Sequence, residues 1–281
     1  MTARLELSSD GIVHRAIEGQ DAYDSWHLAL YMKEILEYRR LIAIRNTDLA
    51  LVPRKEKNLL VYLLLRAGKY KSVLELGSSL FEIVDGLMAT ARCFNDDSVV
   101  AVVPDLLQYR GIELSEFLGK TSKELHPWAY LDVVNNVDNS HGCDVLYDRA
   151  VSSYAFETVD QLVKFLSQAK AGILNLFLSR GETFSVMKVG RKQTYFSANE
   201  LKRKLPDGVG LIHLFGNKAP GSVVSGDKAT EGFYLYADRE LAEAFDWEAR
   251  QSEAVMKWFK EKGIYLNLAN DNRILPQTNP S

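Results

Sequence analysis

Residues 72–79 read SVLELGSS. Five largely apolar residues that end at Gly77 are typical of a short buried strand. Glycine permits a sharp turn and lets the backbone approach a ligand closely. Ser78 and Ser79 then offer hydroxyl and amide groups at the start of the next helix. The stretch therefore predicts the first strand of an open α/β sheet and a ligand-binding turn at its carboxyl end.

Strands and helices alternate beyond this stretch. Helices are expected from Phe81 to Met88 and over residues 158–168. Apolar runs predict six more strands, at residues 112–114, 130–134, 144–147, 173–177, 210–215 and 232–236. The last two would form an antiparallel pair at the sheet edge. The pattern indicates an α/β fold, with a three-layer, Rossmann-like, seven-stranded mostly parallel sheet.

The same pattern divides the chain into three parts. Residues 1–69 can form a small hairpin and then read as helices, which would make an N-terminal α-helical cap or lid. Residues 70–238 hold the sheet. Residues 239–281 read as one amphipathic helix up to residue 262, followed by a polar tail.

Composition excludes several classes of function. The chain has 281 residues, 47% hydrophobic and 25% charged, with a net charge of −3, which is ordinary for a globular protein. Its Lys and Arg residues are scattered, so no nucleic-acid partner is expected. The N-terminus lacks the pattern of a signal peptide, and the apolar runs are too short to cross a membrane. Histidines and cysteines show no ligand spacing, so we expect no metal. The two cysteines read as reduced thiols, which together with the missing signal-peptide pattern suggests a cytoplasmic protein.

The stretch 72–79 resembles the first motif of class I S-adenosylmethionine (SAM)-dependent methyltransferases. That motif is an apolar strand, an acidic residue and Gly-x-Gly, and here Ser79 replaces its second glycine. Judged by strand order, the resemblance covers roughly residues 70–238. It implies that SAM is the cofactor and that Glu75, Gly77, Ser78 and Ser79 contact it.

The resemblance also implies a ribose-binding acid. Glu113, followed by Leu114, is similar to the acid after the family's second strand, whose two oxygens would accept hydrogen bonds from both ribose hydroxyls. Glu113 lies 113 − 77 = 36 residues after Gly77, where about 20 is usual for this fold. Asp105 is the alternative acid.

Two further strand ends resemble family positions. Asn135 or Asn136, after the third strand, would meet the adenine amino group. Asp148 and Arg149, after the fourth, would face the methionine part of SAM and the substrate. These roles are implied by the resemblance alone.

Methyl transfer requires above all that the nucleophile be aligned with the methyl group. A base is needed only when that nucleophile is protonated. Tyr154, Asn175 and His213 are the candidates for a base or an orienting group. A buried amide such as Asn175 must be hydrogen-bonded, and both a backbone and a ligand partner remain open. His213 lies in an apolar run, which favours a core histidine over a catalyst.

The substrate candidates are aromatic residues outside the first five strands. Trp26 and Tyr31 lie in the N-terminal helices, which often cover the active site in small-molecule methyltransferases. Tyr195 lies between the fifth and sixth strands, in what reads as a positively charged loop. Packing of these aromatic residues, and a plain solvated loop, are the simpler interpretations for most of this region.

Three functions are compatible with these features. The first is methyl transfer from SAM to a small metabolite, in specialised biosynthesis. The second is SAM chemistry that releases methylthioadenosine, as in azetidine-2-carboxylate-forming cyclases or aminobutyrate transferases. The third is a non-catalytic binding protein of the same fold. A monomer or a homodimer suits each of them.

Overall fold

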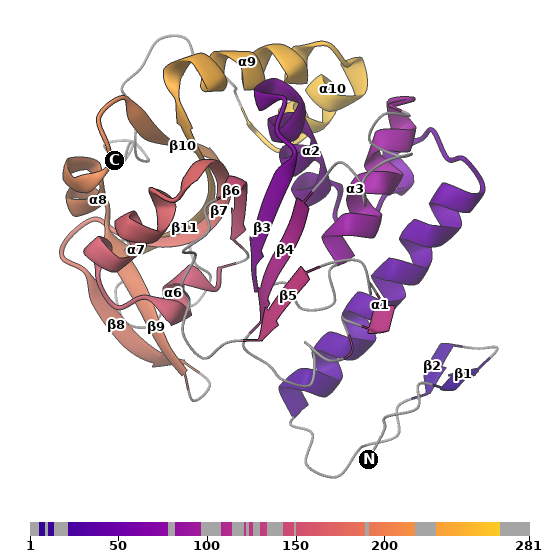
Figure 1. Ribbon diagram of the computed structural model, residues 1–281, viewed down its shortest axis with the longest axis horizontal. Coiled ribbons are helices and arrows are strands. Elements are labelled where there is room, and N and C mark those ends of the chain that lie inside the picture. Colours follow the sequence, from indigo (N-terminus) through magenta and orange to yellow (C-terminus); the bar gives the residue numbers. More distant parts are fainter. Residues whose placement is uncertain are drawn as a thin grey trace. The chain divides into compact units, whose positions relative to one another are not determined.

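The computed structural model describes twelve stretches of the chain, namely residues 6–8, 11–13, 22–77, 82–96, 108–113, 121, 124–125, 130–133, 143–148, 150–188, 191–216 and 229–264. The chain divides into two compact units. The first comprises Met1–Tyr62 and Ser78–Asn135, and the second comprises Leu63–Gly77 and Asn136–Ser281. Figure 1 colours the elements of both units along the sequence.

The helices of the first unit are α1 (Ala22–Ala43), η1 (Leu49–Leu51), the first half of α2 (Lys55–Gly68) and α3 (Glu82–Cys93). Helix α1 packs against α3. Its apolar side chains Leu28, Met32 and Ile35 recur every three or four residues and are buried. Arg39 of α1 lies 3.2 Å from both carboxylate oxygens of Asp85 on α3. The helical character expected of the N-terminal part is confirmed.

Two strand pairs belong to the first unit. The hairpin β1 (Glu6–Ser8) and β2 (Gly11–Val13) is antiparallel. Strands β4 (Gln108–Glu113) and β5 (Tyr130–Val133) are parallel. The expected N-terminal hairpin and the second and third expected strands are therefore confirmed.

The sheet of the second unit has the order β10-β11-β7-β6-β3. Its strands are β3 (Ser72–Leu76), β6 (Cys143–Asp148), β7 (Ala169–Ser179), β10 (Val209–Phe215) and β11 (Ala229–Asp238). Strands β3, β6 and β7 are parallel, whereas β11 is antiparallel to both β7 and β10 (Figure 1). With the parallel pair β4–β5, this confirms the α/β class with seven mostly parallel strands.

Burial explains why the parallel strands read as continuous apolar runs. Leu74 and Leu146 are each 1% exposed, and Val145 and Leu174 are fully buried. Strands that are covered on both faces need apolar side chains at successive positions rather than at alternate ones. The sheet is therefore the core of this unit.

Five helices are described in the second unit, namely α6 (Ser152–Ala155), α7 (Val159–Leu166), α8 (Ala198–Lys204), α9 (Arg239–Arg250) and α10 (Glu253–Glu261). The prediction of one helix over residues 239–262 is wrong. Helix α9 ends at its C-cap Gln251. The Ser252 side chain then caps α10 by accepting from the backbone N–H of Val255. Serine competes with the helical backbone in this way and favours a new helix start.

A hairpin occupies the region that the sequence predicts as a loop between the fifth and sixth strands, so that prediction is wrong. Strands β8 (Phe184–Lys188) and β9 (Arg191–Ser197) are antiparallel. The end of β9 also joins β7 in parallel, with Phe196 opposite Leu178. The hairpin therefore extends directly from the sheet.

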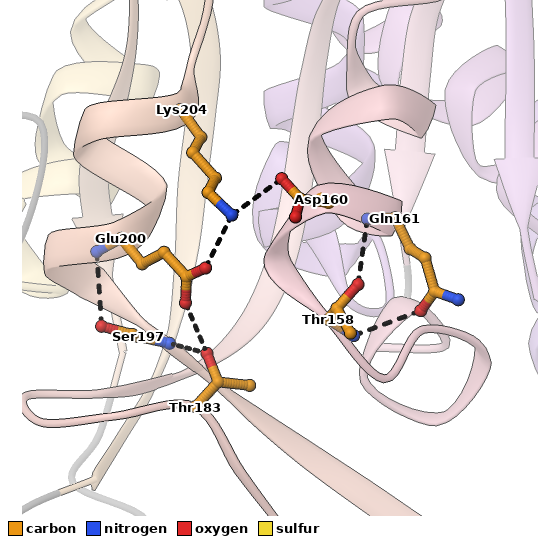
Figure 2. Close-up of polar contacts among 7 residues, drawn as sticks. All are labelled: Thr158, Asp160, Gln161, Thr183, Ser197, Glu200 and Lys204. Atoms are coloured by element: carbon orange, nitrogen blue, oxygen red, sulfur yellow. Dashed lines mark hydrogen bonds and ion pairs between the residues drawn. The ribbon is translucent and has the colours of Figure 1, made fainter.

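Figure 2 shows how the base of the hairpin is held. The backbone N–H of Ser197 donates to Thr183 Oγ1 at 2.9 Å, and the Thr183 hydroxyl donates to Glu200 of α8 at 3.3 Å. Lys204 of α8 then lies 2.8 Å from both Glu200 and Asp160 of α7. These contacts fix β9 relative to both helices.

Helix α7 begins with a reciprocal cap. Thr158 Oγ1 accepts from the backbone N–H of Gln161, and the Gln161 side chain accepts from the backbone N–H of Thr158 (Figure 2). This pairing satisfies two amides that helix geometry leaves without partners. The start of the predicted helix over residues 158–168 is thereby fixed.

Candidate functional site

The turn after β3 requires glycine. Gly77 has φ +76°, and a Cβ atom at this position would lie 2.2 Å from Cγ2 of Val151. The register of β3 and β6 pairs Leu76 with Asp148, so the turn and the end of β6 lie at the same edge of the sheet. This is the carboxyl edge, where open α/β sheets bind ligands.

Glu75 is buried in the sheet just before this turn. Its side chain has 0% exposure, and its backbone lies opposite Tyr147 of β6 in the strand register. Tyr147 is also fully buried. A buried carboxylate is costly in an apolar interior, so Glu75 is a polar exception in the apolar strand and stays a candidate for the site.

Asp148 ends β6 as a buried acid. Its side chain is 1% exposed, and one carboxylate oxygen accepts from the backbone N–H of Ser152 at 3.2 Å while the other accepts from the Ser152 hydroxyl. Burial raises the pKa of Asp148 to about 7, although the hydrogen bonds from Ser152 oppose this shift. The group is therefore divided between its two protonation states near neutral pH.

The backbone beside Asp148 is strained. Ala150 has φ +71°, a left-handed conformation that costs an L-residue about 1–2 kcal/mol. The following helix α6 buries Ser153 completely, and in the described part of the chain its hydroxyl has no hydrogen-bond partner. Tyr154, the next residue, is 38% exposed. Strain and unsatisfied polar groups gather at functional sites, so the turn after β6 is the strongest local candidate.

Asn175 of β7 meets a residue that sequence reasoning missed. Its Nδ2 donates to Glu231 Oε1 of β11 at 3.3 Å. Its Oδ1 is buried and without a hydrogen-bond partner in the described chain. Asp148 is opposite Leu174 in the strand register, so Asn175 lies just past the end of β6. Only the pairing of β7 with β11, which sequence spacing did not predict, could have found Glu231.

Tyr195 lies on β9 and not in a loop. Its side chain is 4% exposed, stacks on Phe184 at 4.9 Å and meets Phe177 edge-on at 5.6 Å between ring centroids. Burial raises the pKa of Tyr195, and the negative charge of Glu231 raises it further. The structure therefore brings together Tyr195, Asn175 and Glu231.

His213 is not a core histidine, so that interpretation is wrong. It lies on the edge strand β10, where its side chain is exposed and its ring lies 5.2 Å from that of Tyr234. An edge strand has a neighbour on one side only, which leaves a side chain such as His213 in contact with solvent. Its proposed catalytic role stays a prediction.

Two predicted residues belong to the first unit and are described there. Tyr31 is 6% exposed, packs with Leu28 and Met32, and lies 5.1 Å below the guanidinium of Arg54. Glu113 is the last residue of β4. The burial of Tyr31 is explained by packing within the helices, which is the simpler interpretation of this aromatic residue. Its proposed contact with substrate stays a prediction.

Some predicted residues cannot be assigned contacts. Trp26 lies in α1, and nothing further is described of its side chain. The others lie outside the described residues, namely Ser78, Ser79, Leu114, Asn135, Asn136 and Arg149. Their roles stay predictions.

Among the described residues, no group of three or more His, Cys, Asp or Glu side chains is arranged to hold a metal ion. None of the helices in the described stretches is both long enough and apolar enough to span a membrane.

No protein-family model and no curated protein sequence matches the chain. Solved structures do. The N-terminal domain of EvdMO1 with S-adenosylhomocysteine (SAH) bound is 8% identical, with 65% of this chain and 80% of that chain covered and a TM-score of 0.47. A SAM-dependent methyltransferase from Clostridium acetobutylicum is 11% identical, with 74% and 98% covered and a TM-score of 0.42.

A third structure is the 1,6-didemethyltoxoflavin-N1-methyltransferase of Burkholderia thailandensis, with bound 1,6-didemethyltoxoflavin and SAH. It is 12% identical, with 83% of this chain and 98% of that chain covered and a TM-score of 0.40. This chain is similar to them in the arrangement of its backbone.

Proposed function

We propose that the chain is a SAM-dependent methyltransferase that acts on a small metabolite in specialised biosynthesis. The observation that carries this proposal is the turn at Gly77, at the carboxyl end of β3 and beside the end of β6. Its positive φ and the absence of room for a Cβ atom match the tight turn at which this type of sheet receives a nucleotide.

One side chain beside the Gly77 turn suits a positively charged ligand. Asp148, which lies opposite Leu76 in the strand register, is a buried acid. The sulfonium of SAM carries a positive charge, which the ionised form of such an acid stabilises. When bound, SAM would supply the electrophilic methyl group, and the residues of this edge would orient the nucleophile toward it.

The test is incubation of the purified protein with SAM alone, followed by mass spectrometry of the nucleosides and by calorimetric titration with SAH. Binding of SAH with SAM left intact supports a methyltransferase that awaits its acceptor. Release of methylthioadenosine above the level without enzyme indicates the aminobutyrate chemistry instead. If neither SAM nor SAH binds, the chain is a non-catalytic protein of this fold and the proposal fails.

A variant tests the ribose role that we propose for Glu113. Glu113→Gln should weaken SAH binding by about 10- to 100-fold, since a hydrogen bond to a charged group contributes about 1.5–3 kcal/mol. Glu124→Gln is the matched control, because Glu124 is exposed. Equal SAH affinity in the two variants would exclude Glu113 as the ribose acid.

A further inference from the structure

One face of the sheet carries a polar cluster between β7, β11 and β9. Phe177 of β7 is opposite Glu231 in the strand register, so the two side chains share a face. Asn175 is two residues before Phe177 and shares that face as well. The ring of Tyr195 contacts Phe177 there. Three strands therefore contribute to one cluster of Asn175, Glu231 and Tyr195.

The hydrogen bond between Asn175 and Glu231 fixes the orientation of the amide. A carboxylate only accepts, so the amide must present Nδ2 to Glu231. The amide oxygen is then turned away from Glu231. It is buried and has no partner in the described chain, although buried acceptors are nearly always satisfied. Asn175 therefore offers an unused acceptor beside a carboxylate.

The cluster has acceptors but, among the described residues, no cation paired with it. Among the described residues, no lysine, arginine or histidine forms an ion pair with Glu231. Burial raises the pKa of Tyr195, and the negative charge of Glu231 raises it further, so the two side chains interact electrostatically. Aromatic faces such as that of Tyr195 attract cations as well. Within the described part of the chain, the cluster therefore has room in its hydrogen bonding and charge for a positively charged group.

A second observation concerns Gln193, two residues before Tyr195 on β9. Gln193 is 0% exposed, and neither its amide oxygen nor its amide nitrogen has a hydrogen-bond partner in the described chain. Alternation along the strand places it on the same face as Tyr195. A side chain that both donates and accepts would bind a neutral polar group such as a hydroxyl or an amide.

We propose that Glu231, Asn175 and Tyr195 bind an alkylammonium group, and that the substrate is a small amine whose neutral polar part reaches Gln193. An ammonium donates three hydrogen bonds, which suits a carboxylate and an amide oxygen beside an aromatic ring. A divalent cation suits the cluster poorly, since such ions prefer several carboxylates and carbonyls. To call this amine the methyl acceptor rests on the proposed function.

SAM also carries an ammonium, so the source must be distinguished. Strand β11 is three positions from β3 in the sheet, and strands lie about 4.8 Å apart, so Glu231 is displaced sideways from the Gly77 turn by about 14 Å. This displacement favours a separate amine over the amino group of a cofactor held at Gly77.

The experiment titrates benzylamine and its neutral analogue benzyl alcohol into the full chain in the presence of SAH, by calorimetry. The wild type should bind benzylamine more tightly than benzyl alcohol. Glu231→Gln should weaken benzylamine binding at least tenfold and leave benzyl alcohol unchanged. Glu243→Gln is the control, since Glu243 lies in an exposed pair with Arg239 on α9. Equal binding of the two probes, or equal loss in both variants, would overturn the proposal.

Further arms separate the alternatives. Asn175→Leu, which removes the free oxygen, should also weaken benzylamine binding, so the test does not depend on one variant that folds. If Glu231→Gln weakens SAH but not methylthioadenosine, which lacks the ammonium of the amino-acid arm, the ammonium is that of the cofactor and the amine substrate is excluded. The titrations are repeated without SAH. If benzylamine then binds although SAH does not, the amine site stands and the proposed SAM-dependent function fails.

Discussion

Strand β6 carries an aspartate near each end, and the structure holds the two in opposite ways. Asp144, near the start, is partly buried and accepts from the backbone N–H groups of Lys71 and Ser72 at 3.1 and 3.2 Å, with the Lys170 ammonium 2.6 Å away. Burial alone would raise the pKa of Asp144, but the hydrogen bonds with Lys170, the Lys71 backbone and the Ser72 side chain lower it.

At Asp148, the last residue of β6, burial outweighs the hydrogen bonds. It raises the pKa to about 7, although hydrogen bonds from the Ser152 side chain and backbone and from the Val151 backbone oppose this shift. Asp144 thus fastens β3, β6 and β7 together at the amino edge, whereas Asp148 is an acid that destabilises the fold when ionised. Perturbed acids of this kind gather at functional sites, so the comparison distinguishes a structural edge from the edge at which we propose the site.

The largest effect that we predict comes from Asp148→Asn. The pKa of Asp148 rises from 3.8 to about 7 on folding, so the folded state binds the proton more tightly. Its stabilising contribution is present below pH 3.8 and is lost as the pH rises through 7. At about 1.4 kcal/mol per pKa unit, wild type should lose about 4 kcal/mol between pH 4 and pH 8 relative to the variant.

Urea unfolding of both proteins at pH 4, 6 and 8 measures this difference. The variant should gain stability over wild type as the pH rises. Parallel dependence of the two unfolding free energies on pH would show that Asp148 is already compensated, and the contrast with Asp144 would disappear.

The second effect concerns Gly77→Ala. The added Cβ atom meets Val151 at 2.2 Å and imposes φ +76° on an L-residue, so the unfolding free energy should fall by about 2–4 kcal/mol. Gly208→Ala is the matched control, with φ +80° and nothing within 4 Å of its Cβ atom. It should show only the strain of about 1 kcal/mol. Equal losses in thermal or urea unfolding would mean that Val151 moves aside easily.

The third effect is smaller and lies at the amino edge. Asp144→Asn should lower the unfolding free energy by about 1 kcal/mol at pH 7, because the pair with Lys170 is lost and the backbone N–H groups of Lys71 and Ser72 donate to a neutral oxygen instead of a charged one. The pKa of Asp144 is depressed on folding. The difference from wild type should therefore be present above pH 3.8 and vanish as the pH falls through the lower folded pKa. If the difference grew as the pH fell, Asp144 would not stabilise the amino edge through its ionised form.

The smallest effect is that of Lys170→Met. The Lys170 side chain is 66% exposed, so solvent and salt screen its pair with Asp144, and the loss of stability should be clearly smaller than that of Asp144→Asn. The difference in unfolding free energy between wild type and the variant should be measurable in low salt and should shrink in high salt, which screens the pair. A loss as large as that of Asp144→Asn would show that the ion pair, and not the amide hydrogen bonds, holds this edge.

Sequence reasoning located the main strands well, since it depends on apolar runs that burial requires on both faces of a parallel sheet. Strand β3 was predicted over the residues that form it, and β6, β7, β10 and β11 were predicted with shorter bounds. The hairpin β8–β9 was missed although its signal exists: Phe184 and Val186 alternate with polar residues before Gly190. The positive charge of this region favoured a loop.

The candidate site was predicted less completely. Gly77 and Asn175 were candidates because each ends or interrupts an apolar run, and Asp148 was a candidate because its stretch resembles a family motif. Glu231 was not identified. Its proximity to Asn175, from which it is 56 residues away in the chain, depends on the register of β7 and β11. Such pairing is set by the whole sheet and leaves no trace in local spacing.

The position of β11 has a consequence for how the protein is made. This strand lies between β7 and β10, yet it follows both of them in the chain. During synthesis on the ribosome, β10 emerges before the strand that is to separate it from β7. Until residue 238 has left the exit tunnel, β7 and β10 both present open edges, which are the surfaces through which incomplete chains associate. The second unit can therefore close only when most of its length has been translated.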